Sequence, residues 1–311
     1  MDNPILSICI PTYNRANKLF NSLGKILDSA TLHSHKVEVI VSDNASHDST
    51  PDIIDKYKEQ YPMLRRYRNP ENLGFNRNFF KLSDEYAMGK YLWVIGDDDF
   101  LDSDAVDIVI GAIEQNPQLT FIGLNFRLLP TTDAILFKKE PIAMKIELTT
   151  VERAIDMQAR PENMLATFLS CNIVLRERFA AFDKSFFSSE SWDNYMSVFP
   201  HSYMLANTIS SKDLGAYIST PLMSVCLHQK AWDDKLAELH LSSIVNIYKH
   251  FNECGYIHMK KSHQIVVEGG ISNLFKKTVN MDLRRYFWRY VRYSPDFYFG
   301  LLSVIYRKIS R

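Results

Sequence analysis

The sequence predicts an α/β protein with a mainly parallel central sheet flanked by helices. Between residues 5 and 126, short apolar runs alternate with segments of 10–15 residues whose apolar positions recur at helical spacing. This alternation is typical of right-handed βαβ units, in which successive strands lie parallel in one sheet. Residues that end strands or start helices separate the segments, as at Pro11 and at Asp48–Pro51.

The elements of this N-terminal half follow in order. Strands are apolar runs ended by turn-forming residues, and we expect them at Ile5–Ile10, Val37–Ser42, Leu64–Tyr67, Tyr91–Ile95 and Leu119–Phe126. Helices are expected at Ala16–Ser29, from Pro51 past Tyr57, from Gly74 to about Ala87, and at Asp102–Gln115.

The second half gives a weaker pattern. Residues 127–160 are expected to be irregular, with a short helix at Thr150–Ala159. Further expected elements are a buried strand at Phe168–Leu175, a helix at Ser191–Ala206 that Pro200 kinks or ends, two short strands at Tyr217–Ser219 and Leu222–Leu227 around Pro221, and helices from Asp233 to Lys308. We place a domain change near residue 230, so that 1–230 form the main domain, with halves 1–126 and 127–230, and 231–311 a helical C-terminal extension.

Composition excludes several classes of protein. The 311 residues have a formal net charge of zero, so no overall field attracts nucleic acid, although 276–311 hold nine Lys or Arg against two acidic residues. The four cysteines lack zinc-like spacing; Cys9, Cys171 and Cys226 lie in apolar runs and are expected to be small core residues, which suits a reducing cytoplasm. We see neither a signal peptide nor a run long enough to span a membrane.

Polar clusters follow directly on three predicted strands. They are Pro11–Arg15, Asp43-Asn44 and Asp97–Asp99. Carboxyl ends of parallel strands share one edge of a sheet, where ligands bind, so these clusters should meet. Three adjacent carboxylates at a buried strand end repel one another unless something offsets their charge. A divalent cation could supply this offset, because hard cations prefer oxygen ligands. The alternative is that the three aspartates only form an acidic turn before the helix at Asp102.

Four motifs occur in a fixed order: Ser7–Arg15, Val39–Ser46, Asn72–Asn78 and Gly96–Asp99. With them the chain resembles a family-two glycosyltransferase of the GT-A fold, of the kind that assembles bacterial surface polysaccharides, including the abequosyltransferase-like group. The resemblance covers roughly residues 5–126. It implies a nucleotide-diphospho-sugar donor that lies across the strand ends.

By this resemblance, the residues of the donor site are Pro11, Tyr13, Arg15, Asp43, Asn72, Arg77, Asp97 and Asp98. Tyr13 would stack on or edge the base, Asp43 would accept hydrogen bonds from the base or ribose, and Arg77 would contact the base or diphosphate. Each of these three residues also has a purely structural interpretation. Tyr13 would be a half-buried aromatic, Asp43 a turn-forming residue, and Arg77 part of a solvated helix face. Asn72 and Gly74 could serve only to form the turn.

The resemblance also implies a cation, Mg²⁺ or Mn²⁺, held in an Asp-x-Asp pattern. Asp99 would ligate it directly, and Asp97 would bond the ribose or a metal-bound water, with Asp98 in the middle. A late histidine often adds a ligand; His228 is best placed and His201 is the rival. Such a cation stabilises the charge that develops on the departing diphosphate.

An inverting transfer needs a general base for the acceptor hydroxyl. The resemblance places a carboxylate after the second block of strands, where Glu190 and Asp193 are available and the family's usual Glu-Asp pair is absent. We favour Asp193, because Trp192 and Tyr195 beside it could form a sugar platform. The alternative for Asp193 is favourable charge in the first turn of a helix.

The C-terminal segment predicts a surface helix. From Leu283 to Tyr293, helical phasing separates an apolar, aromatic face from a face that holds Arg284, Arg285, Arg289 and Arg292. Basic amphipathic helices of this kind lie in membrane interfaces. We expect residues 283–311 to attach the protein peripherally to the inner face of the cytoplasmic membrane; packing on the main domain or on a partner subunit is the alternative.

The sequence therefore predicts a metal-dependent, inverting glycosyltransferase that extends a lipid-linked surface glycan of O-antigen or capsule type. One alternative is a sugar nucleotidyltransferase, but Pro11–Lys18 lacks the glycines of a phosphate loop. The other is a non-catalytic module that binds a nucleotide-sugar or a glycan, which predicts binding without turnover.

Overall fold

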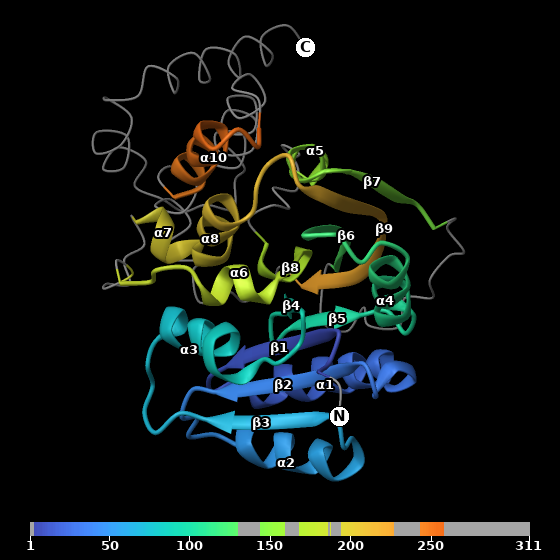
Figure 1. Cartoon of the computed structure of the whole chain (residues 1–311). Helices are drawn as coiled ribbons and strands as arrows, with labels where there is room; N and C mark the ends of the chain where they lie inside the picture. The colour runs from blue at the N-terminus through green and yellow to red at the C-terminus, as the bar shows by residue number, and fades with distance from the viewer. Residues whose placement is uncertain are drawn as a thin grey trace, which may run out of the picture.

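In the computed structural model, residues 3–129, 144–158, 168–185, 187, 194–226 and 243–257 are described. Their strands form one sheet in the order β3-β2-β1-β4-β8-β6-β9-β5, with β7 paired to β9 (Figure 1). The first four strands are parallel to one another: β1 (Leu6–Thr12), β2 (Val37–Asp43), β3 (Leu64–Arg68) and β4 (Tyr91–Val94). This confirms the expected α/β fold and the parallel sheet of the N-terminal half.

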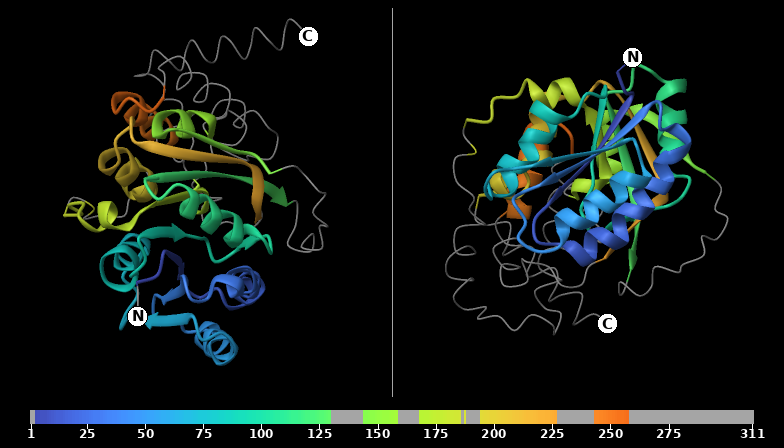
Figure 2. Two further views of the ribbon diagram at one scale, coloured as in Figure 1. Left: turned by 45° about the vertical axis from the view of Figure 1, so that its right-hand side comes forward. Right: turned by 90° about the horizontal axis from the view of Figure 1, so that it is seen from below.

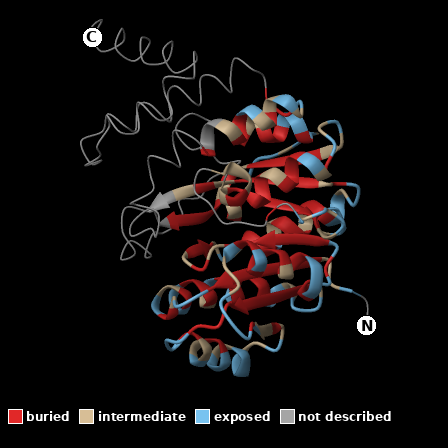
Figure 3. Cartoon of the chain, turned by 90° about the vertical axis from the view of Figure 1, so that its left-hand side faces the viewer, coloured by how far each residue is buried: buried red, intermediate tan, exposed pale blue. Residues whose placement is uncertain are grey.

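Helices cover both faces of the sheet. One face packs against α1 (Ala16–Ala30), α2 (Thr50–Gln60) and α4 (Ala105–Gln115), and α1 and α2 lie side by side in Figure 2. The other face packs against α3 (Phe75–Lys81), its π-helical continuation (Leu82–Tyr86), α5 (Val151–Gln158) and α6 (Arg176–Ala180). The buried strands and the exposed outer faces of the helices stand out in Figure 3.

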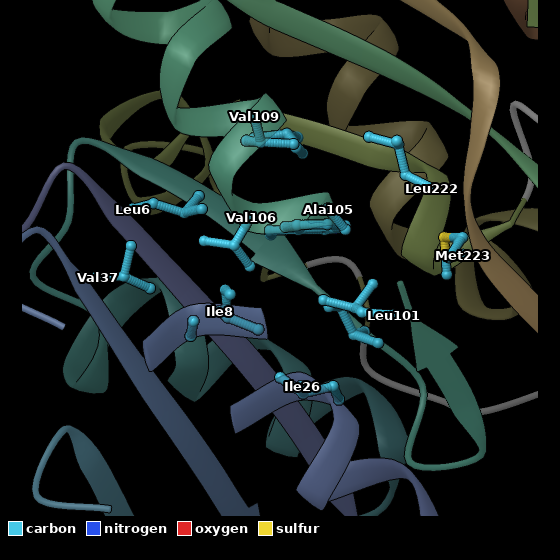
Figure 4. Packing of buried hydrophobic residues seen from close by; sticks show 14 of the residues in the cluster. Leu6, Ile8, Ile26, Val37, Leu101, Ala105, Val106, Val109, Leu222 and Met223 are labelled. Atoms are coloured by element: carbon cyan, nitrogen blue, oxygen red, sulfur yellow. The ribbon is translucent and has the colours of Figure 1, made fainter. Parts of the chain in front are cut away.

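Alternation along β1 divides the core into two layers, because successive side chains of a strand point to opposite faces. Leu6 and Ile8 pack with Val37, Ile26 and Val106 in the first layer (Figure 4). Cys9 faces the second layer. It is fully buried, and burial raises the pKa of its thiol well above the usual value, which confirms it as a core residue.

The second half of the sheet is mixed rather than parallel. It contains β5 (Asp99–Leu101), β6 (Phe121–Leu129), β7 (Ile146–Thr150), β8 (Asn172–Leu175) and β9 (Leu214–Cys226). β8 runs antiparallel to both β4 and β6, and a 3-10 turn at Leu169–Cys171 replaces the first part of the longer strand expected there. β5 and β7 were not anticipated, because each is too short or too exposed to give a clear apolar pattern.

The expectation of two short strands around Pro221 was wrong, because β9 runs through this proline. The pairing of β9 with β6 shifts register between Leu124 and Phe126, and Pro221 lies in the stretch opposite this shift. A proline fits there because an irregular position demands no ladder N–H group. The Asn125 side chain donates to the Ser219 carbonyl at 2.8 Å, and Arg127 donates to the Pro221 carbonyl at 3.0 Å.

Pro200 divides the helix expected at Ser191–Ala206. Its described part consists of α7 (Tyr195–Val198) and α8 (Pro200–Thr208), and Pro200 takes the first position of α8, where no N–H is needed. α10 (Ile244–Glu253) packs through Ile247 and Phe251 into the same core layer as α8. The helices expected beyond residue 257, including the amphipathic one, lie outside the described residues. In the ranges that are described, no helix is long and apolar enough to cross a membrane.

Candidate functional site

The three polar clusters meet at the carboxyl ends of β1, β2 and β4, as expected. Thr12 and Asp43 are register partners at the ends of β1 and β2, and the Asn44 N–H donates to the Thr12 carbonyl at 2.9 Å. The Thr12 hydroxyl donates to Asp97 Oδ2 at 2.8 Å across 85 positions of sequence. Hydrogen bonds therefore join all three strand ends into one rim, which we call the donor rim: residues 11–15, 43–46 and 96–99.

Arg15 connects the first cluster to the aspartates. Its Nε donates to Asp97 Oδ1 at 3.1 Å, and its Nη2 donates to Asp98 Oδ2 at 2.7 Å. Lys18 adds a second cation, with its Nζ 3.5 Å from Asp98 Oδ2. The Arg15 guanidinium, expected in the donor site, thus faces the carboxylates in this structure.

Burial and neighbouring charge oppose each other at Asp97. The residue is 7% exposed. Burial raises the pKa of its carboxyl group and Asp98 adds to the rise, while Arg15 and the Thr12 hydrogen bond act against it. Burial also disfavours the charge on Arg15, but the two aspartates outweigh this and raise the pKa of the guanidinium. Arg15 therefore favours the ionised form of Asp97, which burial alone disfavours.

Asp99 is held separately, at the start of β5. The Ser170 hydroxyl donates to Asp99 Oδ2 and accepts from the Gly96 N–H at 2.9 Å. A Cβ atom on Gly96 would lie 3.0 Å from Asp99 Oδ2, so a side chain at this position would crowd that carboxylate. Ser170 was not identified from the sequence, since it is 71 residues from Asp99 and belongs to no motif.

Asp43 is fully buried and combines a turn with an ion pair. Its Oδ1 accepts from the Ser46 N–H at 2.9 Å, which closes the turn in which Ala45 takes a left-handed conformation (φ 63°). Its Oδ2 lies 3.5 Å from Nη1 of the partly exposed Arg68 and accepts no hydrogen bond from the described residues. Asp43 therefore does form a turn, as its structural alternative predicted, and its Oδ2 is a buried acceptor that a further donor could reach. Arg68, at the end of β3, was another residue missed from the sequence.

An amide network fixes the loop between β3 and α3 against the rim. The buried Asn44 side chain donates to Asn72 Oδ1 at 2.8 Å and to the Gly74 carbonyl at 3.1 Å. Its Oδ1 accepts from the Leu73 N–H and from Asn69 Nδ2, both at 3.0 Å. Asn72 therefore acts here as a turn residue, as does Gly74, whose φ of 78° favours glycine.

The same network anchors the helix that carries Arg77. Asn78 Oδ1 accepts from the Ser42 hydroxyl at 2.6 Å and from Asn69 Nδ2 at 2.9 Å, so α3 is attached to β2 beside the rim. Arg77 itself is exposed in the first turn of α3. Tyr13 is 37% exposed, so both side chains are accessible to a ligand. Pro11 is buried within β1.

The candidate cation ligands are only partly placed. Asp97 and Asp99 belong to the donor rim, and their hard carboxylate oxygens fit Mg²⁺ or Mn²⁺ in chemistry. In the part of the chain that the structure covers, no three His, Cys, Asp or Glu side chains gather into a metal site by themselves. The rival His201 is buried in α8, with its ring 6.5 Å from that of Phe79. Several predicted residues lie outside the described ranges: Glu190, Trp192, Asp193 and His228.

Comparison with known proteins bears directly on this site. A family profile described as glycosyl transferase family 2 matches residues 7–177, a span that includes the whole donor rim. Abequosyltransferase RfbV of Salmonella typhimurium is 28% identical over 229 residues, which cover 70% of this chain and 66% of RfbV. The chain thus spans slightly less than two thirds of that relative.

Solved structures agree on the fold. The 1–349 fragment of S. aureus TarS in complex with UDP-GlcNAc superposes with a TM-score of 0.57 at 14% identity, covering 90% of this chain and 78% of that one. The mannosyltransferase PcManGT of Pyrobaculum calidifontis, in complex with GDP-Man and Mn²⁺, gives 0.55 at 14% identity, covering 98% and 85%. At such identities the likeness shows the fold alone, which is that expected from the sequence.

Proposed function

Because the chain belongs to glycosyl transferase family 2, we propose that it transfers a sugar from a nucleotide-diphosphate donor to a growing surface glycan. The observation that carries this proposal is that hydrogen bonds join three strand ends at one rim, above all the bonds from Thr12 and Arg15 to Asp97. They bring acidic, basic and aromatic side chains together at the sheet edge where α/β proteins bind ligands.

In this proposal the nucleoside binds beside β1 and β2. The exposed ring of Tyr13 offers a face or edge for the base. Asp43 Oδ2 offers a buried acceptor for an N–H or O–H group of the nucleoside, beside the partly exposed Arg68. Arg77 is exposed on α3, where a cationic side chain suits the diphosphate.

The carboxylates of Asp99 and Asp97 would hold a divalent cation, and the donor phosphates would complete its oxygen ligands. When bound, such a cation supplies Lewis-acid stabilisation of the leaving diphosphate. Ser170 fixes the Asp99 carboxylate from one side, and Thr12 does the same for Asp97. Support for a cation comes from the neighbour PcManGT, whose structure contains GDP-Man and Mn²⁺.

The acceptor half of the proposal rests on the sequence. Asp193 is our first choice for the general base and Glu190 the second, with inversion as the stereochemical outcome. His228 would be the additional metal ligand. A lipid-linked acceptor and peripheral attachment through residues 283–311 fit the basic, amphipathic helix that the sequence predicts there. The relationship to an abequosyltransferase supports a role in surface-polysaccharide assembly.

The proposal is tested in two stages. First, thermal unfolding is followed with UDP, GDP, CDP or dTDP, each with Mn²⁺, Mg²⁺ or EDTA; a stabilising nucleotide whose effect disappears with EDTA identifies the donor class. Second, nucleotide release from the matching sugar donors is measured with and without lipid-linked oligosaccharide extracts. Acceptor-dependent release that Asp193→Asn abolishes, without loss of nucleotide binding, supports the proposed transferase and its base.

The non-catalytic alternative makes a different prediction for the same experiment. A binding module would be stabilised by the nucleotide and would release none of it with any acceptor extract. If Asp193→Asn transferred sugar at the full rate, the transferase proposal would stand, and the general base would be Glu190 or another residue.

A further inference from the structure

Arg15 occupies an unusual place in the donor rim. Its backbone precedes α1 and is fixed by a hydrogen bond from its N–H to Thr50 Oγ1 at 3.1 Å. Its side chain is 28% exposed and bridges Asp97 and Asp98. The two distances from Nη2, 3.0 Å to Asp97 and 2.7 Å to Asp98, place one guanidinium between the two carboxylates.

The aspartates have supports that Arg15 does not share. Thr12 donates to Oδ2 of Asp97, and the Ser22 hydroxyl donates to the Asp97 carbonyl at 2.8 Å, so β1 and α1 both hold this residue. Among the described residues, the Arg15 guanidinium donates hydrogen bonds to these two carboxylates. If one group moves when a ligand arrives, the flexible, partly exposed arginine side chain moves more easily than the buried aspartate.

Two of the three rim aspartates already have cationic partners. Asp97 and Asp98 face Arg15 and Lys18 within 3.5 Å, which offsets their two charges, and Asp99 adds a third carboxylate to the rim. A divalent cation that approaches therefore gains less attraction than three bare carboxylates would give, and it meets a guanidinium beside Asp97. A nucleoside diphosphate changes this balance, because it adds negative charge and offers the guanidinium a bidentate partner.

We propose that Arg15 is a removable counter-ion: it neutralises Asp97 and Asp98 in the free protein and leaves them for the donor diphosphate when cation and nucleotide bind together. This inference rests on the proposed function and adds to it an order of events. The free protein binds the cation weakly, and the nucleotide raises that affinity by taking the guanidinium away. Arg15 is thus a positioning residue that couples the two ligands.

The test is the dissociation constant of Mn²⁺, measured by electron paramagnetic resonance at pH 8 on the full chain without nucleotide. Arg15→Gln removes the counter-ion and should tighten Mn²⁺ binding at least tenfold. Arg15→Lys keeps the charge and should stay within about threefold of the wild type. Arg66→Gln is the matched control, because it removes one charge from a residue whose partner is Asp55 on α2, and should change nothing.

A second measurement covers the case in which Arg15→Gln does not fold. In the wild-type protein with ¹⁵N-labelled arginine, the Nε–H signal of Arg15 should shift when Mg²⁺ and the stabilising nucleotide are added together, and stay in place with Mg²⁺ alone. Unchanged Mn²⁺ affinity in a folded Arg15→Gln, or an Arg15 signal that ignores the nucleotide, overturns the inference and leaves the proposed function standing. Failure of the wild type to bind Mn²⁺ with any of the four nucleotides overturns both.

Discussion

Asn44→Ala tests the amide network beside the donor rim. The side chain is 2% exposed and makes four hydrogen bonds, two donated and two accepted. An intramolecular hydrogen bond contributes about 1 kcal/mol net, and a buried group left without a partner costs about 1–3 kcal/mol. Asn72 is exposed, so its amide can hydrogen-bond to water instead, and losing its bond to Asn44 costs less. The substitution should therefore lower the free energy of unfolding by about 3 kcal/mol.

Urea unfolding monitored by far-ultraviolet circular dichroism measures this loss. Asn17→Ala is the matched control, because the same change at an exposed position of α1 should alter stability by less than about 0.5 kcal/mol. In the folded variant, the loop at residues 72–74 loses its attachment to β2, so nucleotide affinity should also fall. An Asn44→Ala protein within about 1 kcal/mol of the wild type would show that this network does not hold the loop.

Four further predictions concern the rim and the C-terminal half. Gly96→Ala should leave the protein folded and weaken cation-dependent nucleotide binding about tenfold in calorimetry, because the added Cβ crowds Asp99 Oδ2. Asp99→Ala should make nucleotide binding independent of the cation. Unchanged binding in either variant would remove Asp99 from the site. Burial lowers the pKa of His250 against the opposing effect of Glu253, so its protonation destabilises the fold as pH falls below about 6.5. His250→Gln should flatten the fall in urea midpoint between pH 7.5 and 5.5, and parallel curves would contradict the assignment. Removing residues 283–311 should release the protein from anionic liposomes, and a truncated protein that still sediments with them would reject the anchor.

Much of the donor rim could be predicted because its parts follow a rule of strand direction. Clusters at the carboxyl ends of three parallel strands must share an edge, so Thr12, Asp43 and Asp97 were brought together by topology alone. The apolar runs likewise predicted where these strands lie in the chain. Local signals sufficed here because each strand pairs with a neighbour from the same half of the chain.

The remaining features depend on long-range pairing that leaves no local pattern. Ser170 reaches Asp99 only because β8 returns antiparallel to β4, and nothing near residue 170 predicts that partner. β5 is three residues long and exists because β9 lies beside it. Pro221 suggested a strand break, but the register shift opposite it accommodates the ring within one long strand.

In the proposed function, the carboxyl ends of β1, β2 and β4 bind a nucleotide donor. Isothermal titration of the stabilising nucleotide with Mn²⁺ into the wild type and Asp43→Asn tests it most directly, because the amide keeps the Oδ1 acceptor for the Ser46 N–H and removes the charge. We expect a normally folded variant with at least tenfold weaker nucleotide binding. Equal affinities in the two proteins would place the nucleotide elsewhere.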